Sequence, residues 1–108
     1  GTTIRDYIHV SDIADIHFKV LQKISKLNKS ITLNCGYGKG LSVKQVVNEF
    51  KKQIKKKIKI NFLPRRLGDM EMIIADNKKL KKFINWRPKY NSIKRIVKSC
   101  IDWEKKFI

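Results

Sequence analysis

The stretch that decides the fold runs from residue 3 to residue 35 and contains three segments: TIRDYIHV (3–10), SDIADIHFKVLQKIS (11–25) and ITLNC (31–35). The first and third segments are rich in β-branched and aromatic residues, which favours short strands. In the middle segment apolar side chains recur every three or four residues from Ile13 to Ile24, which predicts a helix with Ser11 as its N-cap. A strand, a helix and a strand of these lengths form a βαβ unit, so we expect the two strands to be parallel.

Three polar residues of this unit have simple structural interpretations. Asp12 falls in the first turn of the helix, where a carboxylate is favoured by the positive end of the helix dipole. His9 alternates with apolar residues in the first strand, and His17 lies on the apolar stripe of the helix. We expect both histidines to be packed in the core and assign neither to a catalytic site.

The rest of the chain continues the α/β pattern. A glycine-rich turn at residues 36–40 precedes a helix opened by Ser42, and alternation over residues 58–62 predicts a strand. Residues 70–75 can form a short extended piece, and Asp76 or Asn77 caps a brief helix that ends before Pro88. Ser92 opens the last helix. We therefore expect an α/β fold with about three short strands, partly parallel, and four helices.

The net charge of +17 invites an interpretation as a nucleic-acid-binding module. However, 21 of the 26 basic residues are lysines, and they are scattered over helix faces and turns. Aromatic residues do not alternate with the basic runs, as a surface that stacks on single-stranded bases would require. A basic nucleic-acid-binding module remains an alternative, but nucleic acid is not the partner we expect.

The loop LPRRLGD, residues 63–69, concentrates two of the five arginines beside a lone carboxylate. Guanidinium groups can bind phosphates through two hydrogen bonds at once, and a carboxylate can accept hydrogen bonds from sugar hydroxyls. The loop therefore predicts a site for a diphosphate and a ribose. The alternative interpretation is a surface turn with two solvated arginines.

Other features of the sequence restrict the chemistry. The glycine turn lacks the G-x-G-x-x-G spacing of a dinucleotide loop, and Lys55, Lys56 and Lys57 stand where an acidic residue would follow. We interpret these glycines as permitting close approach of backbone segments. Cys35 and Cys100 are expected to be free, buried thiols, and no set of residues has the spacing of a metal site. Neither a signal peptide nor a membrane-spanning run is visible, so we expect a cytoplasmic protein with no membrane partner.

Several ordered phrases resemble UDP-glucose 4-epimerases of the extended short-chain dehydrogenase/reductase superfamily. The phrases are GTTIRDYIHVSDIA (1–14), NCGYGKGLSV (34–43), PRRLGD (64–69), AD (75–76) and WRP (86–88). Together they span almost the whole chain. The chain departs from the family pattern at Leu33 and Ile73, where tyrosines are usual or common, and this bears on the contacts to the sugar.

The resemblance implies substrate-binding roles for five residues. Arg5 and Tyr7 match residues that contact the UDP part of the substrate, and Val43 matches one that lines the nucleotide pocket. Arg66 matches the arginine that contacts the diphosphate, and Asp69 matches the aspartate that holds the uridine ribose.

The resemblance also implies where catalysis belongs. In the family, an N-terminal Rossmann domain binds NAD, and a Tyr-x-x-x-Lys pair supplies the base while NAD takes and returns a hydride. Tyr90 and Lys94 have this spacing, but they lie far along the chain from the family position, so we interpret the match as coincidence.

Residues 1–108 are thus expected to be the C-terminal nucleotide-sugar-binding region of a longer protein. By itself this region is expected to have no catalytic residue and no bound cofactor, with NAD held by the N-terminal half of the intact enzyme. That enzyme would interconvert UDP-glucose and UDP-galactose, and a nucleotide-sugar dehydratase or uronate epimerase is the related alternative. Expected partners are a UDP-sugar, the N-terminal half and, as one oligomeric state, a second copy, because such a region leaves apolar surface exposed.

Overall fold

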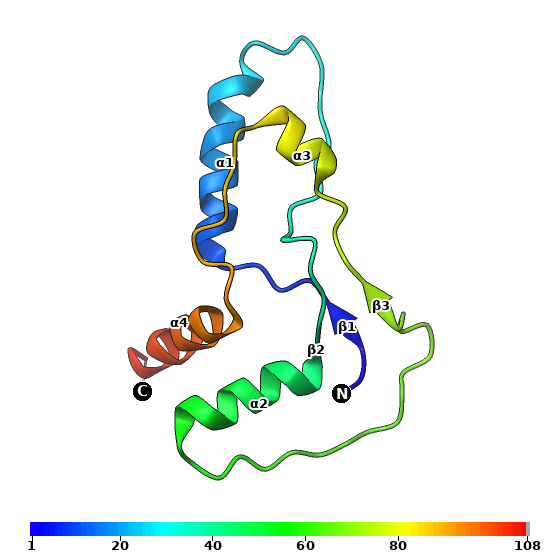
Figure 1. The fold of residues 1–108 in the computed structure, drawn as a ribbon, viewed down its shortest axis with the longest axis vertical. Coiled ribbons are helices and arrows are strands. Elements are labelled where there is room, and N and C mark those ends of the chain that lie inside the picture. The colour runs from blue at the N-terminus through cyan, green and yellow to red at the C-terminus, as the bar shows by residue number, and fades with distance from the viewer. Residues whose placement is uncertain (108) are drawn as a thin grey trace.

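A computed structural model of the protein describes residues 1–107 and contains four helices and three short strands in these residues (Figure 1). The predicted α/β class is confirmed. The elements in chain order are β1 (Ile4–Arg5), α1 (Val10–Ile24), β2 (Leu41–Ser42), α2 (Val43–Ile54), β3 (Met72–Ile73), α3 (Lys78–Phe83) and α4 (Ile93–Lys105).

The sheet has the strand order β2-β1-β3, with β1 in the centre. β1 pairs antiparallel with β2, so that Arg5 lies opposite Leu41, and parallel with β3, so that Arg5 lies opposite Ile73. Two backbone bonds continue the pairing beyond the ladders, from Ile4 N–H to the Glu71 carbonyl and from Val43 N–H to the Thr3 carbonyl. The central strand therefore brings the chain that follows residue 70 beside the N-terminal segment.

The predicted strands at residues 31–35 and 58–62 are wrong, since both segments are irregular. The first strand is also shorter than the predicted range 3–10 and stops at Arg5. A strand needs a neighbouring strand to satisfy its backbone groups, and β1 already pairs with β2 and β3 on its two edges. The alternation in residues 58–62 is only partly reflected in burial, since Ile58 and Ile60 are half-buried but Phe62 is 73% exposed.

Helix α1 begins two residues earlier than predicted, and its N-cap is His9, not Ser11. The His9 ring nitrogen Nδ1 accepts a hydrogen bond from Ser11 N–H at 3.0 Å, which satisfies one of the free donors of the first turn. His9 is buried as predicted, but the prediction of a buried His17 is wrong. His17 is exposed on α1, and its ring contacts the Ile13 carbonyl of its own helix.

The other helices begin where the sequence predicts. Ser42 is the N-cap of α2 and forms a capping box with Gln45, in which each side chain bonds the other residue's backbone N–H. Asn77 is the N-cap of α3 and Ser92 that of α4, although neither side chain bonds its helix. Between the helices, residues 70–75 contain β3, as the expected extended piece.

A small core lies between α1, α3, the glycine turn and the segment that follows α3. Figure 1 shows α1 beside α3, with α2 and α4 together at the other end of the molecule. The buried apolar residues of this core are Ile16, Tyr37, Leu80, Ile84 and Trp86. Cys35 packs against it half-buried, whereas Cys100 is exposed, so the predicted burial of Cys100 is wrong; both thiols are free.

The molecule is open for its size. Its radius of gyration is 16.7 Å, whereas a compact domain of this length has about 13 Å. Its accessible surface is 8888 Å², against about 6,200 Å² for a folded monomer of this mass. Large apolar side chains contribute to the excess, as predicted, among them Val10, Phe18, Leu21, Leu63, Leu67, Trp103 and Phe107. None of the helices described is both long and apolar enough to cross a membrane.

Candidate functional site

Two arginines from distant parts of the chain meet at one carboxylate. Arg5 Nη2 donates to Asp69 Oδ1 at 3.0 Å, and Arg66 Nη2 lies 3.7 Å from Asp69 Oδ2. The Arg5 and Asp69 side chains are 28% and 27% exposed, so their bond is partly sheltered from water, whereas Arg66 is 87% exposed. The structure thus brings Arg5, Arg66 and Asp69 together across a separation of more than 60 positions in the sequence.

Local backbone geometry explains how this cluster, Arg5–Arg66–Asp69, forms. Gly68 has a φ of +80°, a left-handed conformation that L residues rarely adopt, and it lets Asp69 N–H bond the Arg66 carbonyl at 3.2 Å. This tight turn directs the Arg66 and Asp69 side chains toward each other. The chain then enters β3, whose pairing with β1 carries the turn next to Arg5.

The neighbouring Arg65 does not join the cluster. Its Nη2 lies 3.9 Å from Glu71 Oε1, in a pair with both side chains well exposed. The two arginines of the loop are therefore not equivalent.

The other two predicted site residues, Tyr7 and Val43, lie on neighbouring segments. Tyr7 lines a cavity of about 420 Å³ together with the glycine turn and residues 91–93. Val43 begins α2 and is tied to the N-terminal segment by its bond to the Thr3 carbonyl. Neither has a hydrogen bond to the Arg5–Arg66–Asp69 cluster.

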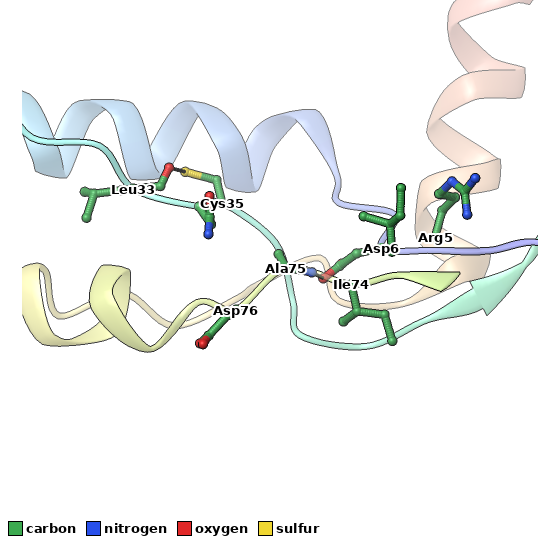
Figure 2. A pocket seen from close by; sticks show the side chains of 9 residues that line it. Arg5, Asp6, Leu33, Cys35, Ile74, Ala75 and Asp76 are labelled. Atoms are coloured by element: carbon green, nitrogen blue, oxygen red, sulfur yellow. Dashed lines mark hydrogen bonds between the residues drawn. The ribbon is translucent and has the colours of Figure 1, made fainter. Parts of the chain in front are cut away.

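Asp6, which sequence reasoning did not single out, joins three segments next to this cluster. Its carboxylate accepts from Tyr37 N–H at 3.0 Å, from Gly38 N–H at 2.8 Å and from Ala75 N–H at 3.3 Å. Figure 2 shows the Asp6 side chain directed at Ala75, with the Arg5 side chain extending away on the other side. Both residues line a cavity of about 490 Å³. The sequence signal that could have identified Asp6 was its position as an acidic residue within an otherwise apolar predicted strand.

The glycine turn packs closely against its neighbours, as predicted. A Cβ on Gly36 would lie 2.5 Å from the Ala75 Cβ and 2.7 Å from Asp6 Oδ2. At Gly40 a Cβ would lie 2.3 Å from Ile4 Cγ2. The amides of Tyr37 and Gly38 already donate to Asp6, so these two groups are engaged within the protein and do not fit a cradle for a cofactor phosphate.

A second buried carboxylate, Asp12, lies at the start of α1 and is only 1% exposed. It accepts from Tyr37 Oη at 2.5 Å and from the amides of Lys89 and Tyr90 at 3.0 Å each. Burial raises the pKa of Asp12, but the hydrogen bond from Tyr37 and those from the two amides outweigh it and leave the pKa below its ordinary value. Burial and the bond to Asp12 raise the pKa of Tyr37 well above the ordinary range.

Tyr90 takes part in this buried network through its backbone amide, which donates to Asp12. Its ring stacks on His9 with centroids 4.5 Å apart, and the Arg95 guanidinium lies over it at 5.8 Å. The Tyr90 ring therefore takes part in packing, and the interpretation of the Tyr90 and Lys94 spacing as a coincidence stays a prediction. Within residues 1–107 no group of three His, Cys, Asp or Glu side chains is placed to hold a metal ion.

The fold and the motifs define a class of protein. Residues 1–100 match the model of a family described as GDP-mannose 4,6 dehydratase, and the chain belongs to this family, within the extended short-chain dehydrogenase/reductase superfamily. The resemblance to UDP-sugar 4-epimerases predicted from the motifs is confirmed.

Individual relatives agree. Over 97% of its length the chain is 38% identical to a UDP-glucose 4-epimerase of Azospirillum brasilense, of which it covers 30%. It is 43% identical to the solved UDP-Glc/GlcNAc 4-epimerase of Campylobacter jejuni, with a TM-score of 0.86, covering 97% of this chain and 32% of that one. For the Bifidobacterium longum UDP-glucose 4-epimerase, solved with NAD+ and UDP, identity is 34%, TM-score 0.81 and coverage 97% and 31%. The chain thus spans about a third of the length of these relatives.

Proposed function

We propose that residues 1–108 form the C-terminal, UDP-sugar-binding region of an NAD-dependent UDP-sugar 4-epimerase. In the intact enzyme this region holds the nucleotide while UDP-glucose and UDP-galactose are interconverted. The observation that carries the proposal is the convergence of Arg5 and Arg66 on Asp69. The similarity to UDP-sugar 4-epimerases along 97% of the chain supports it.

The chemistry of the cluster suits a nucleoside diphosphate. Two guanidinium groups from separate segments can bind both phosphates of a diphosphate, and each charge-assisted hydrogen bond contributes about 1.5–3 kcal/mol. Asp69 has oxygens that accept from the two ribose hydroxyls. We assign Tyr7 and Val43 to the walls of the nucleotide pocket, on the resemblance alone.

The cofactor and the catalytic groups belong, in this proposal, to a preceding Rossmann domain. NAD held by that domain would supply reversible hydride transfer to and from the sugar. The relative from Bifidobacterium longum was solved with NAD+ and UDP, which supports use of this cofactor. Residues 1–108 contribute binding and orientation of the UDP part, and a second copy of the protein is a proposed partner.

A nucleotide-sugar dehydratase is the second candidate, favoured by the description of the matching family. Both enzymes would bind the nucleotide through the same cluster, so they differ in the product. Incubation of the intact protein with UDP-glucose and NAD distinguishes them, because an epimerase yields UDP-galactose and a dehydratase yields a 4-keto-6-deoxy sugar.

The test of the proposed site is a titration of the intact protein with UDP. Arg66→Ala is expected to weaken UDP binding about tenfold or more, since it removes a charge-assisted contact to the diphosphate. Lys56→Ala is the matched control, because it removes one positive charge from the same long loop outside the cluster. Equal losses in the two variants contradict the diphosphate role.

The same titration addresses the nucleic-acid alternative. An RNA-binding module would lose affinity steeply as salt increases, with little dependence on Arg5 or Arg66. Binding of RNA in place of UDP would overturn the proposed function.

A further inference from the structure

The anion that the two guanidiniums contact in this structure is the protein's own carboxylate. Asp69 presents Oδ1 to Arg5 and Oδ2 to Arg66, so each of its oxygens faces a different guanidinium. Under the proposed function, the same guanidiniums bind a diphosphate. A carboxylate and a phosphate oxygen require the same N–H donors, so they compete for them.

We propose that Asp69 determines the selectivity of the site, by favouring nucleoside diphosphates over bare phosphate anions. This inference rests on the proposed function and adds a second role to Asp69. A bare diphosphate that enters the cluster displaces Asp69 from its N–H donors and leaves the carboxylate without replacements. A nucleoside diphosphate also displaces it, but the ribose hydroxyls provide new donors for the carboxylate oxygens.

The burial of the two pairs indicates which of them sets the selectivity. Arg5 and Asp69 are each little more than a quarter exposed, and their 3.0 Å separation is a full hydrogen bond. Arg66 is 87% exposed and lies 3.7 Å from the carboxylate, so water screens this pair strongly. The Asp69 carboxylate and an incoming phosphate therefore compete mainly for Arg5. Arg66 remains the more accessible guanidinium for an arriving anion.

Arg5 is also held in place without Asp69. Its Nη1 donates to the Ile4 carbonyl at 2.8 Å, and Ile4 belongs to the central strand of the sheet. Removal of the negative charge of Asp69 therefore leaves one anchor on the Arg5 side chain. We expect the guanidinium to stay near the cluster and to bind a bare anion more strongly.

The experiment measures binding of three probes to the intact protein by calorimetry: inorganic pyrophosphate, uridine and UDP. Asp69→Asn is expected to bind pyrophosphate about tenfold more tightly, the effect of freeing one charge-assisted bond, and to bind uridine more weakly. The ratio of UDP to pyrophosphate affinity then falls by at least about tenfold. Asp69→Glu, which keeps the charge, is expected to keep pyrophosphate binding weak.

Asp102→Asn is the matched control for charge. It removes one negative charge from α4, where Asp102 pairs with Lys98 on the surface, and is expected to leave all three affinities within about twofold. A general increase in anion binding in this variant would overturn the inference.

Failure of the inference differs from failure of the proposed function. If Asp69→Asn weakens pyrophosphate binding as much as UDP binding, Asp69 merely holds the arginines and the selectivity role is wrong. If UDP binding depends on Arg5 and Arg66 but the affinity ratio is unchanged in Asp69→Asn, the inference alone fails. If the folded wild-type protein binds neither UDP nor uridine, the proposed function fails and the inference falls with it.

Discussion

Asp12 connects three parts of the chain through one buried carboxylate. Its donors come from the glycine turn, through Tyr37, and from the segment after Pro88, through the amides of Lys89 and Tyr90. Tyr37 Oη also accepts from His9 N–H at 3.1 Å, which ties the start of α1 to the same group. A buried carboxylate with three donors stabilises the fold only while it is ionised.

This arrangement predicts an acid-sensitive stability. The hydrogen bonds hold the pKa of Asp12 below its ordinary value of 3.8, so its contribution is present above that pH. The contribution is lost as the pH falls through the lower pKa of the folded state. Asp12→Asn is expected to be less stable near neutral pH, and its free energy of unfolding should fall less on acidification than that of the wild type. Urea denaturation at several pH values measures the free energy of unfolding of the two proteins. If this free energy falls equally on acidification in the wild type and in Asp12→Asn, the prediction is contradicted.

Single residues show where sequence reasoning reaches its limit. We expected Asp12 to act as a dipole partner in the first turn, because only its own helix is visible from the sequence. Its actual donors lie 25, 77 and 78 positions away. The prediction that His17 is buried was wrong for a similar reason, because an apolar stripe on a helix is buried only where another part of the fold covers it. The grouping of Arg5 with Arg66 and Asp69 was accessible, because the family motifs named all three.

At the scale of elements, α2 combines a half-buried face that packs on α4 with a local cap at its N-terminus. No residue of α2 is fully buried, so its stability also depends on this cap. Its first turn has a complete capping box, with Gln45 N–H donating to Ser42 Oγ at 3.1 Å and Ser42 N–H to Gln45 Oε1 at 2.8 Å. These two bonds satisfy donors that would otherwise be free at the N-terminus of the helix.

Ser42→Ala is therefore expected to destabilise the protein by about 1 kcal/mol. Ser92→Ala is the matched control, because Ser92 occupies the same position on α4 but its side chain makes no capping bond. Thermal unfolding followed by circular dichroism compares the two variants. Equal losses would show that the hydroxyl of Ser42 contributes nothing specific.

The helices were predicted correctly, but the predicted strands at residues 31–35 and 58–62 were wrong, and one physical reason explains the difference. A helix satisfies its hydrogen bonds within its own segment, so apolar spacing and caps such as Ser42 and Ser92 locate it. A strand is defined by its neighbour, and residues 31–35 and 58–62 show that alternation alone does not supply one. The observed strands β1 and β2 have two residues each, which is too short for any periodicity to mark.

At the scale of the whole molecule, the surface of 8888 Å² is larger than that of a compact monomer by about 2,700 Å². An excess of this size is comparable to what one partner buries in a large permanent interface. Exposed apolar side chains occur on α1, on α4 and along residues 62–74. The chain as described therefore exposes more surface, including apolar surface, than a compact monomer of its mass.

Residues 1–108 expressed alone are expected to self-associate, because burial of apolar surface is favourable at about 25 cal/mol per Å². Light scattering after gel filtration should give a mass above 12.7 kDa that increases with concentration. A monomer with a radius of gyration near 13 Å in X-ray scattering would contradict the prediction, since it would mean that the chain closes on itself.

The two tryptophans differ strongly in their exposure to solvent. Trp86 is 4% exposed and stacks on Tyr37 in the core, whereas Trp103, on α4, is 60% exposed and contacts Phe107, which follows that helix. Their fluorescence therefore separates two processes without any added label. Emission from Trp86 follows melting of the interior, and quenching of Trp103 by a small solute follows the covering of α4 by another surface.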